Sequence, residues 1–129
     1  MHVYEKVLRT YMKALGESDY DTIKGLFSED GEVQSPFIGL NNASSFFDQL
    51  GGASSNNDIT PIDVFLSQDD KEHAVAYFQY DWTVKDGTLI SFKVMDLFTF
   101  EPGSDKIRKL DLIYDTHPIR ETAGNKYES

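Results

Sequence analysis

One acidic residue interrupts an otherwise hydrophobic strand face. Residues 89–101 read LISFKVMDLFTFE, a pattern typical of a β-strand. Because alternate side chains of a strand share a face, Asp96 is grouped with Phe92, Val94, Phe98 and Phe100. A carboxyl group on such a face must pair with a cation, accept hydrogen bonds or stay protonated. A protonated carboxyl can donate a hydrogen bond to a developing oxyanion. The alternative is a structural Asp bonded to a backbone N–H or a tyrosine hydroxyl.

The composition limits the class of protein. The 129 residues predict one domain, 1–129, in which the polar residues 118–129 form a loose tail. A net charge of −10 without a cluster of Lys or Arg argues against nucleic acid and anionic membranes as partners. The absence of Cys excludes disulfides and sulfur-ligated metals. Because no long apolar run indicates a signal peptide or a membrane span, we expect a cytoplasmic location.

Hydrophobic periodicity predicts helices followed by strands. A first helix over residues 3–15 places Tyr11 on its buried face, and Asp19 is a suitable N-cap for a second helix that reaches Phe27. The remaining elements are a strand at 32–35, a helix at 41–50, and strands at 59–67, 72–84, 89–101 and 106–115. Residues 51–58 read GGASSNND, which predicts a mobile loop or lid.

The Asp86-Gly87 pair predicts a tight hairpin between two of the long strands. If Lys85 pairs with Thr88, the register puts one set of side chains on the cavity face of the sheet: Tyr77, Gln79, Asp81, Phe92, Val94 and Asp96. The opposite face is then too apolar for water, which predicts a homodimer interface made of Phe78, Tyr80, Trp82, Met95 and Leu97.

The order of elements and several local sequences resemble the nuclear transport factor 2 (NTF2)-like superfamily, which includes ketosteroid isomerase and the SnoaL-like polyketide cyclases. The resemblance spans residues 3–117 and rests on DYDTIKGLFSEDGEVQSPF, VMDLFTF and KIRKLDLIYD. It implies an α+β fold in which a cone-shaped, curved antiparallel sheet packs three N-terminal helices in its concave face, a cystatin-like α+β barrel. Small apolar or carbonyl-containing molecules are the partners that it implies.

Ketosteroid isomerase offers a comparison by position. Its oxyanion-hole tyrosine, counted back from Pro36-Phe37, falls on Tyr11. Its protonated aspartic acid falls on Asp96. The neutral Asp of that family is an established case, so the resemblance supplies this role for Asp96. The general base of the family corresponds to Ser35 here. A serine hydroxyl is not a base at neutral pH without an activating neighbour.

Other acids are candidates for the missing base. Asp81 is the first, because the predicted register puts it on the cavity face about 13 Å along the sheet from the pair of Tyr77 and Asp96. Its alternative role is that of a solvated residue at the cavity mouth. Asp115 and His117 are the second candidates, although the strand alternation turns Asp115 away from the face of Leu110, Leu112 and Tyr114, and an exposed strand end explains His117 better. The ligand pocket is predicted to be lined by Ser35, Phe37, Tyr77, Gln79, Phe92, Val94, Leu110, Leu112 and Tyr114.

The sequence leaves three functional classes open. The first is an isomerase, dehydratase or cyclase that polarises a carbonyl or enol through Tyr11 and Asp96. The second is a non-catalytic binder of a small hydrophobic molecule, in which these residues orient the ligand and Gln79 adds a hydrogen bond. The third is a dimeric interaction module, because this fold does not fix function. No cofactor is predicted, and the spacing of the histidines predicts no metal site.

Overall fold

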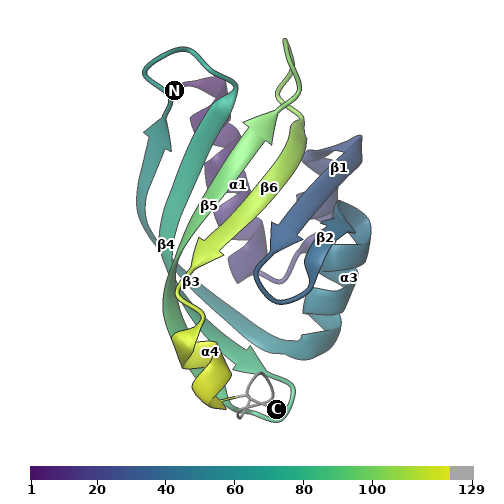
Figure 1. Ribbon diagram of the computed structural model, residues 1–129, viewed down its shortest axis with the longest axis vertical. Helices are drawn as coiled ribbons and strands as arrows, with labels where there is room; N and C mark the ends of the chain where they lie inside the picture. The colour runs from purple at the N-terminus through teal and green to yellow at the C-terminus, as the bar shows by residue number, and fades with distance from the viewer. Residues whose placement is uncertain (123–129) are drawn as a thin grey trace.

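A curved, open sheet of six strands wraps around the first helix (Figure 1). The computed structural model describes residues 1–122, and the strand order is β2-β1-β6-β5-β4-β3. The mixed α+β class that the sequence predicted is confirmed. The sheet is not purely antiparallel, because β1 runs parallel to β6. Its concave face and the helices enclose the hydrophobic core.

The first two helices begin at side-chain caps. His2 caps α1 (Val3–Gly16) by accepting a hydrogen bond from the backbone N–H of Tyr4, and Asp19 caps α2 (Tyr20–Gly25) in the same way. One face of α1 is buried in the concavity, as its periodicity predicted: Val7, Leu8, Tyr11, Met12, Ala14 and Leu15. The second helix is shorter than predicted, because Phe27 already begins β1 (Phe27–Ser35).

The predicted loop over residues 51–58 is wrong. After β2 (Gly39–Asn42), helix α3 (Ala43–Ala53) begins with Asn42 as its N-cap and continues through both glycines. Strand β3 (Ser54–Leu66) then starts at once, although its first residues are polar. Pairing with β4 and the burial of Asn57 explain the ordered strand, because tertiary contacts override weak local propensity.

The last three strands, each predicted from the sequence, form an antiparallel meander. They are β4 (His73–Val84), β5 (Leu89–Phe100) and β6 (Ile107–Tyr114), and each pairs antiparallel with the next. Asp96 and its apolar neighbours on β5 are buried, which confirms the strand pattern.

The predicted hairpin register is off by one residue. Val84 pairs with Thr88 around the three-residue loop 85–87, where Gly87 has φ +90°. Tyr80 therefore faces Phe92, and Ala76 faces Asp96. A one-residue slip turns every side chain of β4 to the other side of the sheet. Tyr77, Gln79 and Asp81 consequently lie on the convex face, and not in the cavity.

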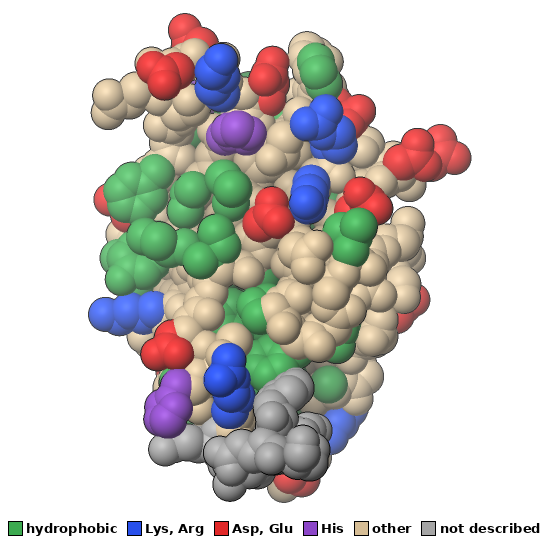
Figure 2. Space-filling view, in the orientation of Figure 1, with side chains coloured by type: hydrophobic (Ala, Val, Ile, Leu, Met, Phe, Trp, Pro, Cys, Tyr) green, Lys and Arg blue, Asp and Glu red, His purple; other side chains and the backbone are tan. Residues whose placement is uncertain are grey.

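The same shift overturns the predicted dimer interface. Phe78 and Tyr80 are buried in the concavity, and Trp82 lies beside them. The convex face nevertheless carries a second group of apolar side chains, which Figure 2 shows gathered over β3, β4 and β5. We call this group the outer patch: Phe65, Val75, Tyr77, Met95, Leu97 and Ile113. Phe65, Met95 and Ile113 are 45%, 42% and 53% exposed.

The end of the chain is not a loose tail throughout. Helix α4 (His117–Thr122) follows β6 and places Ile119 against the core with 8% exposure. Residues 123–129, the rest of the predicted tail, lie outside the described residues.

Candidate functional site

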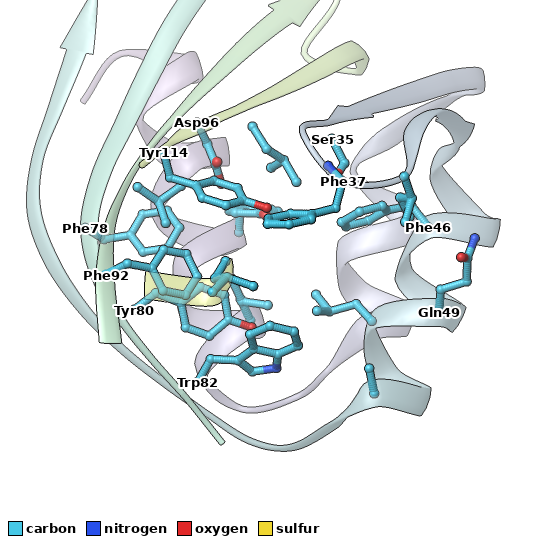
Figure 3. A pocket seen from close by; sticks show the side chains of 18 residues that line it. Ser35, Phe37, Phe46, Gln49, Phe78, Tyr80, Trp82, Phe92, Asp96 and Tyr114 are labelled. Carbon is cyan, nitrogen blue, oxygen red and sulfur yellow. Dashed lines mark hydrogen bonds between the residues drawn. The ribbon is translucent and has the colours of Figure 1, made fainter. Parts of the chain in front are cut away.

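An apolar cavity of about 280 Å³ lies between the concave face of the sheet and helices α1, α3 and α4 (Figure 3). Its aromatic side chains form a nearly continuous wall, in which the ring centroids of Tyr80 and Phe92 are 5.2 Å apart and those of Phe92 and Tyr114 are 5.1 Å apart. The lining residues are Tyr11, Leu15, Ser35, Phe37, Ile38, Phe46, Gln49, Leu50, Ala53, Phe78, Tyr80, Trp82, Phe92, Val94, Asp96, Leu112, Tyr114 and Ile119.

Asp96 reaches this cavity from the middle of β5. Its exposed fraction is 1%, and its Oδ1 atom has no hydrogen-bond partner among the described residues. A buried carboxyl oxygen without a partner is costly in a folded protein, because the lost hydration is not replaced. This oxygen is therefore the point of the cavity at which a polar group of a ligand has most to gain.

Tyr11 reaches the same region from α1. Its ring packs edge-on against Phe98, with ring centroids 5.0 Å apart, and its side chain is 2% exposed. The hydroxyl interacts with the Asp96 carboxyl, so the residues identified by the helical and the strand periodicity lie close together. Burial first, and then the nearby Asp96 carboxyl, raises the pKa of Tyr11, which keeps the hydroxyl protonated.

Burial controls the protonation of Asp96. It raises the pKa of this carboxyl well above the ordinary value, and the hydrogen-bonding interaction with Tyr11 lowers it by a smaller amount. The charged form loses more hydration in this cavity than Tyr11 returns. Asp96 is accordingly a neutral acid that can donate a hydrogen bond, and such a group is a poor proton acceptor.

Ser35 ends β1 at the cavity wall and is 5% exposed. Its Oγ accepts a hydrogen bond from the backbone N–H of Phe37 at 3.2 Å. Among the described residues that line the cavity, Asp96 is the only one with a carboxyl group, and it is held neutral. The described site thus supplies hydrogen-bond donors without an evident general base.

A buried polar network supports the other end of the cavity, and sequence reasoning missed it. Tyr80 donates its hydroxyl hydrogen to Oδ1 of Asn57 at 2.5 Å, and Trp82 donates its indole N–H to Oγ of Ser54 at 2.7 Å. Both acceptors belong to β3, within the segment for which the sequence predicted a loop. Its polar composition was the only available signal, and composition does not distinguish a mobile loop from a strand with buried polar partners.

The structure brings together most of the predicted pocket residues. Those that line the cavity are Tyr11, Asp96, Ser35, Phe37, Phe92, Val94, Leu112 and Tyr114. Leu110 is fully buried in the core and does not line the cavity. Tyr77, Gln79 and Asp81 are excluded from it by the strand register, so Asp81 is not positioned to act as the base. Their places are taken by Phe78, Tyr80 and Trp82.

The second candidate base lies outside the cavity as well. Asp115 and His117 are both exposed, and the Asp115 carboxylate accepts a hydrogen bond from the backbone N–H of His117 at 3.0 Å. Within residues 1–122, no group of three or more His, Asp or Glu side chains is arranged to hold a metal ion. No helix in the same range is long and apolar enough to cross a membrane.

Comparison with known proteins agrees with the fold. A family model described as a SnoaL-like domain matches residues 8–109. No curated protein sequence matches the chain. An NTF2-like protein of unknown function from Burkholderia pseudomallei is 15% identical, with a TM-score of 0.77 over 94% of this chain and 97% of that one.

Two further solved structures are similar. SalBIII, an epoxide hydrolase/cyclase-like enzyme of pyran ring formation in the polyether salinomycin, is 20% identical, with a TM-score of 0.71 over 87% of this chain and 90% of that chain. A protein with a ketosteroid isomerase-like fold from Catenulispora acidiphila, solved in complex with trimethylamine, is 14% identical, with a TM-score of 0.75 over 89% of each chain. At these identities the likeness concerns the fold.

Proposed function

This chain belongs to the SnoaL-like domain family of the NTF2-like superfamily, and we propose that it binds a small, largely apolar molecule whose carbonyl or enol oxygen accepts a hydrogen bond at the Tyr11–Asp96 pair. The observation that carries the proposal is Oδ1 of Asp96, which has no hydrogen-bond partner among the described residues and lies at a largely apolar cavity. A ligand oxygen at this point would satisfy a buried polar atom, and the aromatic wall would contribute apolar contact area.

The similar structures support a small-molecule role. SalBIII is described as an epoxide hydrolase/cyclase-like enzyme, and the Catenulispora protein was solved with trimethylamine. A purely structural module has no use for a neutral acid beside a cavity, which argues against a role limited to a dimeric interaction module. Between enzyme and binder, the lack of a base at Ser35 favours binding, or a reaction that requires only polarisation of the carbonyl.

Acetophenone is a suitable first probe, because it combines one carbonyl oxygen with an apolar ring. Trp82, the only tryptophan of the chain, lines the cavity, so its fluorescence reports binding directly. Tyr11→Phe and Asp96→Leu should each weaken binding by about 3- to 10-fold, which corresponds to one hydrogen bond to a neutral ligand. Fluorescence titration of the three proteins measures the dissociation constants.

Tyr77→Phe is the matched control, because it removes a tyrosine hydroxyl from the convex face of the same sheet. It should leave the dissociation constant unchanged. If acetophenone binds wild type and both cavity variants equally, the Tyr11–Asp96 pair is not the polar contact. If no carbonyl compound of this size binds the wild-type protein, the proposed function itself is rejected.

We also propose that the protein forms a homodimer through the outer patch. The support is an apolar group on the convex face that no helix within residues 1–122 covers, with Met95 at its centre between Tyr77 and Ile113. Net charge of −10 opposes association of two copies, so the apolar contact must outweigh the repulsion.

Met95→Glu tests the outer patch. The side chain is 42% exposed in the protomer, so the substitution should leave the fold intact. Burying an unpaired carboxylate in an interface costs several kcal/mol, which should weaken dimerisation by about 100-fold or more. Sedimentation velocity at micromolar concentration should show a dimer for wild type and a monomer for the variant. A wild-type monomer would reject the dimer.

A further inference from the structure

Tyr80 brings a further polar atom to the cavity, and the hydrogen of its hydroxyl is already used. The residue is 7% exposed and lies on the cavity face of β4. Its hydroxyl donates to Oδ1 of Asn57 at 2.5 Å. A tyrosine hydroxyl has one hydrogen and two acceptor lone pairs. The donation to Asn57 leaves only accepting capacity on the Tyr80 oxygen.

The distances around the Asn57 amide set its orientation. Its Nδ2 donates to the Tyr20 hydroxyl at 2.7 Å and to Oγ of Ser18 at 3.2 Å. Hydroxyls can donate as well as accept, so these two contacts alone do not orient the amide. The 2.5 Å contact with the Tyr80 hydroxyl does, because it suits an O–H···O bond and is too short for N–H···O, so the amide oxygen faces Tyr80. Asn57 is 2% exposed, so water does not compete for these bonds. The network therefore holds the Tyr80 hydroxyl in a donating state.

The neighbouring indole adds no donor to this end. Its N–H is used on Oγ of Ser54 at 2.7 Å, and Ser54 in turn donates to the backbone carbonyl of Leu50 at 2.6 Å. Figure 3 shows Tyr80 and Trp82 together at one end of the lining residues and Asp96 at the other. Tyr80 and Trp82 together therefore offer a hydrogen-bond acceptor at this end of the cavity, and neither has a donor left for a ligand.

The Asp96 end has the opposite character. Neutral Asp96 and Tyr11 carry one hydroxyl hydrogen each, so a hydrogen bond between the two residues would use only one of them. One donor remains for a ligand. Along β4, four residues separate Tyr80 from Ala76, the pairing partner of Asp96, which is about 13 Å of strand. The two polar ends are thus separated by the aromatic wall.

We propose that Tyr80 is a specificity-determining residue that accepts a hydrogen bond from the ligand. The molecule bound here is then a hydroxy ketone or a related compound, with an acceptor at one end and a hydroxyl or N–H donor at the other. Asn57 is the positioning residue that fixes this polarity. The inference rests on the proposed function, because it takes the carbonyl contact at Tyr11–Asp96 as given. It adds the second functional group of the ligand and the direction of its hydrogen bond.

Matched aryl ketones test the polarity on the wild-type protein. The probes are acetophenones that carry para-hydroxyl, para-methyl or para-methoxyl groups, and the corresponding naphthyl ketones, in which the two polar groups lie farther apart. Hydroxyl and methyl are similar in size, but only hydroxyl donates a hydrogen bond. In the phenyl or the naphthyl series, whichever has the spacing between polar groups that matches the cavity, the hydroxyl compound should bind about 3- to 10-fold more tightly than the methyl and methoxyl compounds. Trp82 fluorescence again provides the readout.

Variants assign this preference to Tyr80. Tyr80→Phe should abolish the preference for hydroxyl over methyl, whereas Tyr77→Phe, on the opposite face of the same strand, should retain it. Asn57→Leu should free the Tyr80 hydrogen and allow the methoxyl compound to bind as well as the hydroxyl compound. Because the Asn57 variant can fail to fold, the wild-type panel and Tyr80→Phe decide the outcome without it.

The failures of the two proposals are distinguishable. If the ketones bind but neither series shows a preference for hydroxyl, the role of Tyr80 is overturned while the carbonyl contact stands. A preference that survives Tyr80→Phe would also overturn it, because the hydroxyl would then bind elsewhere. If no ketone binds, the proposed function fails first.

Discussion

Ser35→Asp is expected to raise double-bond isomerisation of a small β,γ-unsaturated ketone by about 10²- to 10⁴-fold over the wild-type protein, the usual contribution of a positioned base. Ser35 lines the cavity that holds the Tyr11–Asp96 pair. The introduced carboxylate would take a proton from the carbon between the carbonyl and the double bond and return it to the far alkene carbon. The neutral Asp96 would stabilise the dienolate by donating a hydrogen bond. Steady-state kinetics measures the change.

Ser35→Asn is the matched control for this experiment. It has nearly the same shape as the aspartate variant but cannot take up a proton at neutral pH, so it should remain as slow as wild type. Strong activity of the wild-type protein would show that another group serves as base. No gain in the aspartate variant, with ketone binding and fold intact, would contradict a preorganised oxyanion site and favour simple binding.

Asp96→Asn is expected to change the pH dependence of stability. The pKa of Asp96 is raised in the folded protein, so its carboxyl is held protonated there and ionises more readily in the unfolded chain. This contribution to stability is fully present below the unfolded pKa, near 4, and is lost as pH rises towards the folded pKa. The loss approaches about 1.4 kcal/mol per pH unit within that window. Asparagine does not titrate, so the variant should gain on wild type as pH rises.

Urea unfolding of both proteins between about pH 4 and pH 7 measures this difference. Asp69→Asn, which removes an exposed carboxyl from the turn between β3 and β4, is the control and should follow the wild-type curve closely. A constant difference between wild type and Asp96→Asn across this range would mean that Asp96 keeps an ordinary pKa. The donor role proposed for it would then be lost.

Patterns that depend on one element alone were predictable from the sequence. The helical period placed Tyr11 on the buried face of α1, and the strand period placed Asp96 on the buried face of β5. Each pattern needs only the local geometry of its own element, and hydrophobic neighbours fix the direction of the buried face. The two side chains that define the polar point of the cavity were therefore identified in advance.

Features that depend on how two elements meet were not predictable. The Asp86-Gly87 pair marked the hairpin correctly but did not decide between a two-residue and a three-residue loop. The longer loop puts Tyr80 on the cavity face and Asp81 on the convex face, the reverse of the prediction. Asn57 was assigned to a loop because its strand is polar, and its partners Tyr20 and Tyr80 come from distant parts of the chain. Long-range polar partners leave no periodic signal in a single sequence.

The infrared difference spectrum between wild type and Asp96→Asn at neutral pH shows directly whether Asp96 is protonated, because protonated and ionised carboxyl groups absorb at different frequencies. For Asp96 we expect the carbonyl stretch of a protonated carboxylic acid, and this band should shift when acetophenone occupies the cavity. Carboxylate bands at neutral pH, or a carbonyl stretch that does not respond to a ketone bound in the cavity, would contradict the account.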